Sequence, residues 1–117
     1  MYELMVEGTF DAAHQLIGYD GPCENLHGHT WKAQAFIKGT KLNDLGMVRD
    51  FKEIKQILQP VLSKLDHSNL NEHAYFKKVN PTSENVAKYI FDQISTNADV
   101  TKVTVFESAS TSASYMK

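Results

Sequence analysis

The chain has 117 residues, of which 42% are hydrophobic and 22% charged, and its formal net charge at pH 7 is -2. These values are typical of a globular protein and predict a single domain over residues 1–117. The negative charge argues against the broad basic surface that binds nucleic acid. No apolar run reaches the roughly 20 residues of a membrane helix. The single cysteine excludes an internal disulfide, and residues 1–7 lack the pattern of a signal peptide, so we expect a cytoplasmic protein.

Two strands are expected in the first third of the chain. Residues 2–10 alternate between apolar and polar side chains, and residues 29–38 do the same, with the apolar side chains at odd positions. His27 and His29 share that odd parity, so they point toward the covered face of the sheet if the second strand begins early enough. Antiparallel pairing of the two strands would then bring His14, which follows the first strand, beside them.

A first helix is expected after Asp50, which together with Glu53 forms a capping-box pattern. Apolar residues keep the helical period from there to Leu65. Pro60 interrupts this stretch and, lacking an amide donor, is expected to kink or shorten the helix.

A second helix is expected after Thr82, a good N-cap residue, with its apolar stripe ending at Ile94. Further strands are expected over residues 102–108 and 113–117. The order is therefore ββααββ, which predicts an α+β fold: a four-stranded antiparallel sheet with two helices on one face. Open edges and an uncovered face favour a homo-oligomer.

Three imidazoles and the only thiol lie within sixteen residues. His14, His27 and His29 would form the three-nitrogen zinc site that catalytic centres use, with the fourth position open to water or substrate. Cys23 would instead close a structural site if it were the fourth ligand. Cys23 is also interpretable as a small buried hydrophobe, or as a thiolate base or nucleophile beside the metal. The residues alone leave these alternatives open.

Two acidic residues are further candidates. Asp66 could orient the imidazole of His67 and raise its basicity for proton transfer, or the pair could simply end a helix. Glu107 has the parity of Val103 and Val105. A carboxylate at such a position usually meets solvent at the rim of a sheet, but it could also accept two donors from a planar heterocycle.

Five motifs occur in order along essentially the whole chain: Phe10-Asp11-Ala12-Ala13-His14, Cys23-x-x-x-His27-Gly28-His29, Leu65-Asp66-His67-x-x-Leu70-Asn71, Pro81-Thr82-x-Glu84-Asn85 and Val105-Phe106-Glu107-Ser108. Together they resemble the 6-pyruvoyl-tetrahydropterin synthase / 6-carboxy-tetrahydropterin synthase family. The three residues between Cys23 and His27 resemble the 6-carboxy branch of queuosine (7-deazapurine) biosynthesis.

This resemblance implies the tunnelling fold (T-fold), with subunits in trimers that pair into hexamers and active sites at subunit interfaces. It implies Zn²⁺ as the cofactor, and it implies Cys23 as catalytic base with Asp66 and His67 as its partner dyad. Glu107 would anchor the pterin ring. The zinc ligands implied by the resemblance are His14, His27 and His29.

The activity implied by the resemblance is conversion of 7,8-dihydroneopterin triphosphate to 6-carboxy-5,6,7,8-tetrahydropterin, with release of acetaldehyde and triphosphate. The alternative enzyme is the 6-pyruvoyl synthase, which eliminates triphosphate. A non-catalytic, zinc-stabilised pterin-binding protein, with Cys23 as fourth metal ligand, is the alternative outside enzymes. The triphosphate requires cations that the motifs do not assign. Arg49 is the only arginine, and the other candidates are lysines of this chain or of a neighbouring subunit: Lys32, Lys38, Lys77 and Lys78.

Overall fold

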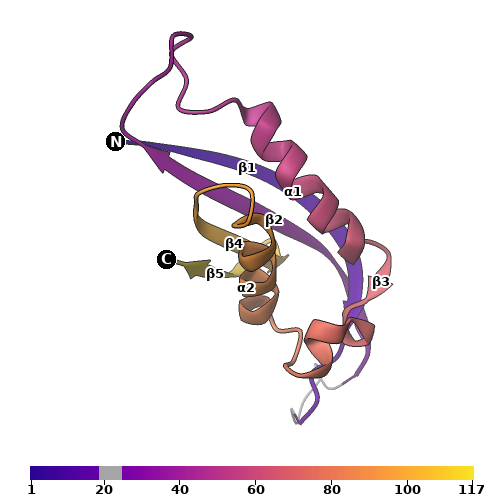
Figure 1. Cartoon of the computed structure of the whole chain (residues 1–117). Helices are drawn as coiled ribbons and strands as arrows, with labels where there is room; N and C mark the ends of the chain where they lie inside the picture. Colours follow the sequence, from indigo (N-terminus) through magenta and orange to yellow (C-terminus); the bar gives the residue numbers. More distant parts are fainter. Residues whose placement is uncertain (19–24) are drawn as a thin grey trace.

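The computed structural model describes residues 1–18 and 25–117, and its centre is a five-stranded sheet in the order β3-β1-β2-β4-β5 (Figure 1). Two long antiparallel strands, β1 (Tyr2–His14) and β2 (His27–Gly39), pair along their full lengths. Both strands extend beyond the expected ranges, and the extensions contain His14 and His27, whereas His29 lies within the expected second strand. The register places His14 opposite His27 and Ala12 opposite His29, as the predicted antiparallel pairing required.

The sheet continues on one side of β2 with two antiparallel strands. β4 (Val100–Ser108) pairs with β2, and β5 (Thr111–Met116) pairs with β4 and forms the open edge. At the other edge, β3 (Ser68–Asn69) pairs in parallel with β1. The expected four strands are therefore present, and β3 is an addition that makes the sheet mixed. Its two polar residues carry no alternation that would have predicted a strand.

The helices α1 (Phe51–Leu65) and α2 (Ser83–Ile94) begin at the expected N-caps. The Asp50 side chain accepts from the amide of Lys52, and the Thr82 hydroxyl accepts from the amide of Asn85. The expectation that Pro60 shortens the first helix is wrong, because α1 continues past it to Leu65. Pro60 lies on the exposed side of α1, away from the packed stripe, so the missing amide leaves no buried carbonyl.

Both helices cover the same face of the sheet, α1 over β1 and α2 over β4 and β5 (Figure 1). The sheet contributes every second residue of its strands to this core. Buried residues on neighbouring strands lie opposite each other, for example Val6, Ala35 and Val103 across three strands. Short 3₁₀ turns at Leu70–Glu72 and Ala74–Lys77 connect β3 to α2. Burying each large apolar side chain contributes roughly 1.5–3 kcal/mol. The largest fully buried residues include Trp31, Phe10, Leu62, Leu65, Leu70, Ile90 and Ile94.

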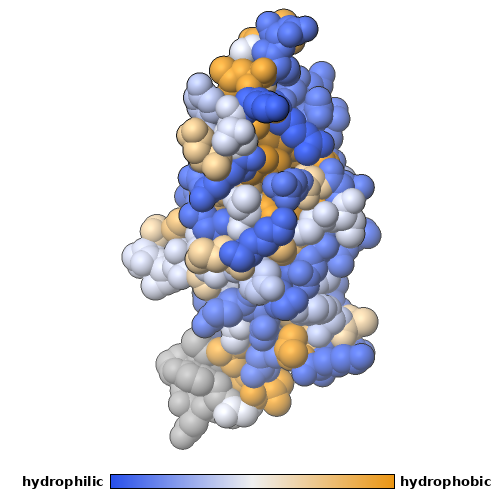
Figure 2. All heavy atoms as spheres, turned by 60° about the vertical axis from the view of Figure 1, so that its left-hand side comes forward, coloured by the Kyte–Doolittle hydropathy of each residue, from blue (hydrophilic) through white to orange (hydrophobic). Residues whose placement is uncertain are grey.

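The side of the molecule that carries β5 shows mostly hydrophilic side chains, with apolar patches between them (Figure 2). On the face of the sheet opposite the helices, aliphatic amines lie over aromatic rings. Lys32 is 4.7 Å from the ring centre of Phe106, and Lys102 is 4.2 Å from that of Phe36. Among the described residues, no helix is both long and apolar enough to cross a membrane.

Candidate functional site

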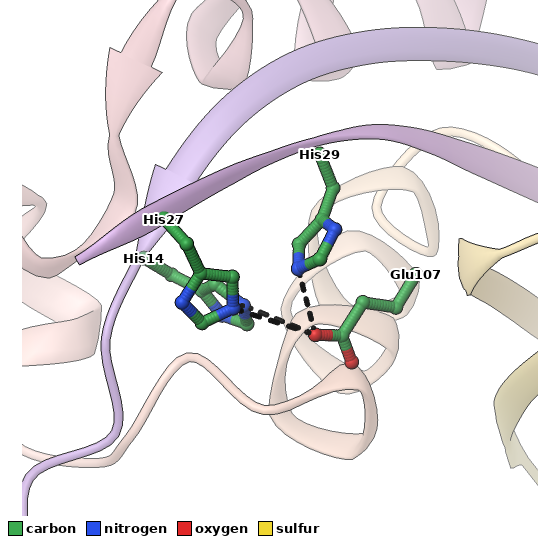
Figure 3. Close-up of side chains that lie close together, drawn as sticks. All are labelled: His14, His27, His29 and Glu107. Carbon is green, nitrogen blue, oxygen red and sulfur yellow. Dashed lines mark hydrogen bonds and ion pairs between the residues drawn. The ribbon is translucent and has the colours of Figure 1, made fainter. Parts of the chain in front are cut away.

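Three imidazoles converge at the end of the sheet where β1 ends and β2 begins (Figure 3). His14 is buried, with 1% of its surface exposed, and His27 and His29 are half-buried. All three point toward the helix-covered face, because they have the parity of the buried residues on their strands. The Nε2 atoms of His14 and His27 are 3.0 Å apart. The structure thus brings together the three predicted metal ligands.

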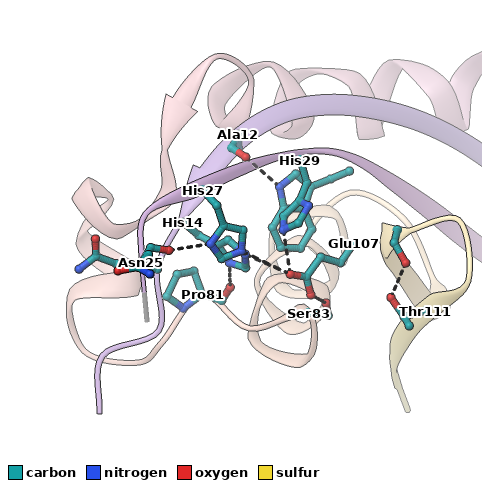
Figure 4. Close-up of polar contacts among 12 residues, drawn as sticks. Ala12, His14, Asn25, His27, His29, Pro81, Ser83, Glu107 and Thr111 are labelled. Atoms are coloured by element: carbon teal, nitrogen blue, oxygen red, sulfur yellow. Dashed lines mark hydrogen bonds and ion pairs between the residues drawn. The ribbon is translucent and has the colours of Figure 1, made fainter. Parts of the chain in front are cut away.

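Backbone carbonyls set the tautomers of two of these rings (Figure 4). Nδ1 of His14 lies 2.7 Å from the carbonyl oxygen of Pro81, and Nδ1 of His27 lies 2.6 Å from that of Asn25. A carbonyl oxygen only accepts hydrogen bonds, so each Nδ1 must carry the proton. In the neutral rings, both Nε2 atoms then present lone pairs to the shared space. Metal-binding histidines are commonly oriented in this way.

Glu107 completes the group from β4. Its Oε1 atom lies 3.1 Å from Nε2 of His14, 3.0 Å from Nε2 of His29 and 4.0 Å from Nε2 of His27. Its other oxygen, Oε2, accepts a hydrogen bond of 3.1 Å from the hydroxyl of Ser83, at the start of α2. The carboxylate therefore points into the histidine cluster, although 27% of the Glu107 side chain stays exposed.

The donor set fits a divalent cation. The four ligand atoms, one each from His14, His27, His29 and Glu107, all lie within 4.8 Å of one another. Nε2 of His29 is a buried nitrogen without a hydrogen-bond partner in the described part of the chain, because its approach to Glu107 is outside hydrogen-bond geometry. Two imidazole lone pairs facing each other at 3.0 Å also require a proton or a cation between them.

The protonation of His29 also suits metal binding. Burial lowers its pKa below the ordinary value, and the neighbouring His14 and His27 lower it further, while the charge of Glu107 opposes this. The ring is therefore neutral at neutral pH, which is the form that binds a metal.

Asp66 and His67 form a hydrogen-bonded pair next to β3. Nδ1 of His67 lies 2.9 Å from Oδ2 of Asp66, and Oδ1 of Asp66 accepts from the amide of Asp11 at 2.8 Å. The amide of His67 donates to the carbonyl of Asp11 at 2.6 Å. Asp11 thus fixes both members of the pair through its backbone. The bend needed for two adjacent residues to bond comes from His67, whose φ is 55°.

The pair has shifted pKa values. The pKa of Asp66 is lowered, first by the amide of Asp11 and then by His67. The pKa of His67 is raised, first by its hydrogen bond to Asp66 and then by the charge of that carboxylate. The imidazole is therefore a stronger base than an isolated histidine, which suits proton transfer near neutral pH.

The pair does not face the histidine cluster of its own chain. Asp11 and Thr30 alternate with buried neighbours, so they lie on the face of the sheet opposite the helices, where the Thr30 hydroxyl donates to Asp11 at 2.5 Å. These two residues and His67 line a depression of about 510 Å³ that also reaches the strand at His29. The ligand atoms of Asp66 and His67 belong to a group separate from the histidine cluster. Cys23 lies outside the described residues.

The motifs did not identify several residues that organise these two groups. Ser83 fixes the orientation of Glu107, the carbonyl of Pro81 fixes the ring of His14, and Asp11 supports Asp66 and His67. Asp11 and Pro81 belong to the ordered motifs, so their positions were indicated but their contacts were not. Ser83 occupies a variable position of its motif, and no signal in the sequence marked it.

Comparison with known sequences places this geometry in a family. The family model described as 6-pyruvoyl tetrahydropterin synthase matches residues 3–117. The 6-carboxy-5,6,7,8-tetrahydropterin synthase of Synechocystis is 35% identical over 99 residues, which cover 80% of this chain and 75% of that protein. A putative enzyme of the same name from Archaeoglobus fulgidus is 39% identical over 97 residues, which cover 80% and 79%.

Two further relatives carry other names. The dihydroneopterin monophosphate aldolase of Pyrococcus furiosus is 35% identical over 94 residues, which cover 80% of this chain and 75% of that protein. The structure of Caenorhabditis elegans 6-pyruvoyl tetrahydropterin synthase superimposes with a TM-score of 0.89 at 28% identity, covering 99% of this chain and 95% of that chain. The family model, the sequence relatives and the fold agree, and this chain belongs to the 6-pyruvoyl tetrahydropterin synthase family.

Proposed function

We propose that this protein is a zinc enzyme that converts 7,8-dihydroneopterin triphosphate and one water molecule to 6-carboxy-5,6,7,8-tetrahydropterin, acetaldehyde and triphosphate. The observation that carries the proposal is the convergence of three imidazole Nε2 atoms and a carboxylate oxygen at one end of the sheet. Relatives named for this product support the choice of reaction. Synthesis of queuosine in the cytoplasm is the corresponding physiological role.

In this proposal His14, His27 and His29 hold the metal. A bound metal would supply Lewis acidity toward the side-chain hydroxyls of the substrate and stabilise negative charge on their oxygens. Neutral imidazoles are required for this, and the lowered pKa of His29 favours the neutral form. Zinc is the expected ion because three imidazoles and one further position are its usual catalytic environment.

The remaining residues bind substrate and move protons. His67 would accept and return a proton through Nε2, since Nδ1 is bonded to Asp66. Cys23 would be the second proton-transfer group, acting as the base on the substrate side chain. Glu107 would bind the donors of the pterin ring with its two oxygens. No nicotinamide is needed, because the dihydropterin ring accepts the electrons.

We further propose that each active site forms between subunits of a homo-oligomer. The support is geometric: the histidine cluster faces the helices, whereas Asp11, Thr30 and the depression beside His67 are on the other face of the same sheet. A neighbouring subunit that contributes its His67 would complete the site. The open edge at β5 offers backbone groups for such an association.

Product analysis tests the reaction. Zinc-loaded protein is incubated with 7,8-dihydroneopterin triphosphate, and the products are identified by mass spectrometry, with His27→Ala as the control that removes a metal ligand. We expect 6-carboxy-5,6,7,8-tetrahydropterin and acetaldehyde from the unaltered protein only. Formation of 6-pyruvoyl-tetrahydropterin alone would assign the chain to the other branch. Unchanged substrate with folded, zinc-loaded protein would refute the enzymatic proposal for this substrate.

Two further incubations refine the assignment. 7,8-dihydroneopterin monophosphate is supplied in parallel, because one relative is named for an aldolase that acts on this compound; faster turnover of it than of the triphosphate would contradict the proposed substrate. Cys23→Ala separates the catalytic thiol from a structural one. We expect the variant to keep its zinc and lose turnover, whereas loss of zinc together with thermal stability would make Cys23 a metal ligand.

A further inference from the structure

Glu107 is oriented in a way that substrate binding alone does not explain. A carboxylate waiting for two donors of a planar ring would present both oxygens to the open site. Here Oε1 is directed at the three Nε2 atoms and Oε2 is held by the hydroxyl of Ser83 (Figure 4). Both oxygens therefore already have partners in this arrangement, and Oε1 is turned away from the orientation in which the two oxygens would face a ring together.

The position of Oε1 corresponds to a coordination corner. With bonds of about 2.0–2.2 Å to nitrogen and oxygen, the corners of a tetrahedral zinc site are roughly 3.3–3.5 Å apart. Oε1 lies between 3.0 and 4.0 Å from the Nε2 atoms of His14, His29 and His27. The distances from Oε1 to the three Nε2 atoms are thus close to the ligand–ligand distances of a four-coordinate zinc site.

Two features hold the carboxylate in this place. Glu107 is near the end of β4 and has the parity of the fully buried Val103 and Val105, so its side chain leaves the strand on the covered face. Ser83 lies directly after the N-cap Thr82, where α2 begins. Its hydroxyl donates to Oε2 and so turns Oε1 toward the histidines. The rigid start of a helix therefore orients the fourth donor.

We propose that in the substrate-free protein Glu107 is the fourth ligand of the metal, positioned by Ser83, and that the dihydropterin substrate displaces it. The metal site is closed by a carboxylate at rest and opens only when substrate hydroxyls replace Oε1. The released carboxylate is then free to accept donors from the pterin ring. This inference rests on the proposed function, because it assumes the metal and the substrate class assigned there.

Metal titration tests the resting state without measuring activity. The affinity for Zn²⁺ is determined by competition with a chromophoric chelator, and the visible spectrum is recorded after loading with Co²⁺. The variants are Glu107→Gln, which keeps the shape but weakens the ligand, and Ser83→Ala, which leaves the carboxylate intact. Glu84→Gln is the matched control, because Glu84 is exposed in the same first turn of α2.

We expect Glu107→Gln to lower zinc affinity at least about tenfold and to change the Co²⁺ spectrum, since a neutral amide oxygen is a much weaker ligand than a carboxylate. Ser83→Ala should lower affinity by a smaller factor, and Glu84→Gln should match the unaltered protein. Unchanged affinity and an unchanged spectrum in Glu107→Gln would overturn the inference while leaving the metal site intact. Failure of the unaltered protein to bind zinc or cobalt would overturn both this inference and the proposed zinc enzyme.

Addition of 7,8-dihydroneopterin, which carries the side-chain hydroxyls without phosphate, tests the displacement. We expect it to change the spectrum of the Co²⁺-loaded protein, because a carboxylate is exchanged for hydroxyl oxygen. Binding of the pterin, measured by fluorescence, with no change in the spectrum would refute displacement. A spectral change without turnover of the triphosphate would support this inference and contradict only the proposed reaction.

Discussion

The backbone of His67 is held in an uncommon conformation beside an acidic partner. Its φ of 55° lies in the left-handed region, which costs free energy for a residue other than glycine. The hydrogen bond from its amide to Asp11 and the bond from its ring to Asp66 maintain this conformation. The result is an imidazole fixed relative to its carboxylate, although the His67 side chain is largely exposed.

Replacing Asp66 by asparagine should lower the pKa of His67. The largest causes that raise this pKa are the hydrogen bond and the charge of Asp66, and an asparagine side chain would supply no charge and a weaker acceptor. In the unaltered protein the imidazole loses its proton only as the pH rises through the raised pKa. In the variant it loses the proton at lower pH. NMR titration of the histidine ring signals, with His67→Ala to assign the resonance, measures the shift.

The matched control for this measurement is Asp44→Asn, because Asp44 is an exposed aspartate in the loop before α1. It removes the same charge from the chain without touching His67. A pKa of His67 that shifts equally in both variants would show that net charge, and not the Asp66 contact, sets its value. A pKa unaffected by Asp66→Asn would contradict the hydrogen-bonded pair.

At the scale of elements, β1 and α1 approach each other closely at Gly8. A Cβ atom added there would lie 2.7 Å from Cδ1 of Leu62, a side chain with no exposed surface. Gly8 is therefore needed because the helix packs directly onto the strand, not because of a special backbone conformation. The same contact fixes the distance between α1 and the sheet.

Gly8→Ala should lower the free energy of unfolding by about 1–3 kcal/mol, because the buried Leu62 must leave its preferred position. Urea denaturation of the metal-free protein, at one fixed protein concentration, measures the change. Gly28→Ala is the matched control: its Cβ would meet nothing closer than 3.9 Å, so we expect a neutral or slightly stabilising effect. Equal effects of the two substitutions would show that strand propensity, not the contact with Leu62, is responsible.

The elements that the sequence predicts well are those whose pattern is local. The alternation of β1 and β2 and the caps at Asp50 and Thr82 need no knowledge of distant residues. β3 was missed because Ser68 and Asn69 pair with β1 only through a tertiary contact. The expected shortening of α1 at Pro60 does not occur, because the cost of a proline depends on which side of the helix meets solvent, and this is decided by packing.

At the scale of the whole molecule, parity and pairing were enough to predict the cluster of His14, His27 and His29, since two adjacent strands supply all three. The position of Glu107 relative to them depends on β4 lying next to β2, which no local pattern contains. The order of the motifs likewise grouped Asp66 and His67 with the histidines. It gave no indication of the face of the sheet on which each group lies. That separation is a property of the folded chain and leads to a prediction about its assembly.

Two inactive variants should restore activity to each other if sites form between subunits. His27→Ala removes one of the proposed metal ligands and keeps His67, whereas His67→Ala keeps the histidine cluster of its own chain. In oligomers assembled at random from equal amounts of the two, about a quarter of the interface sites would pair an intact cluster with an intact His67. Each variant alone should stay inactive.

We therefore expect the mixture obtained by co-expressing the two variants in equal amounts, without selection for mixed oligomers, to show about a quarter of the activity per site of the unaltered protein. The control is the double variant His27→Ala/His67→Ala mixed with an equal amount of unaltered subunits. A site between subunits is then intact only where both neighbours are unaltered, which again holds for about a quarter of the sites. Native mass spectrometry confirms that mixed oligomers are present. Mixed oligomers of the two single variants that remain inactive, beside an active control mixture, would show that His67 serves the cluster of its own chain.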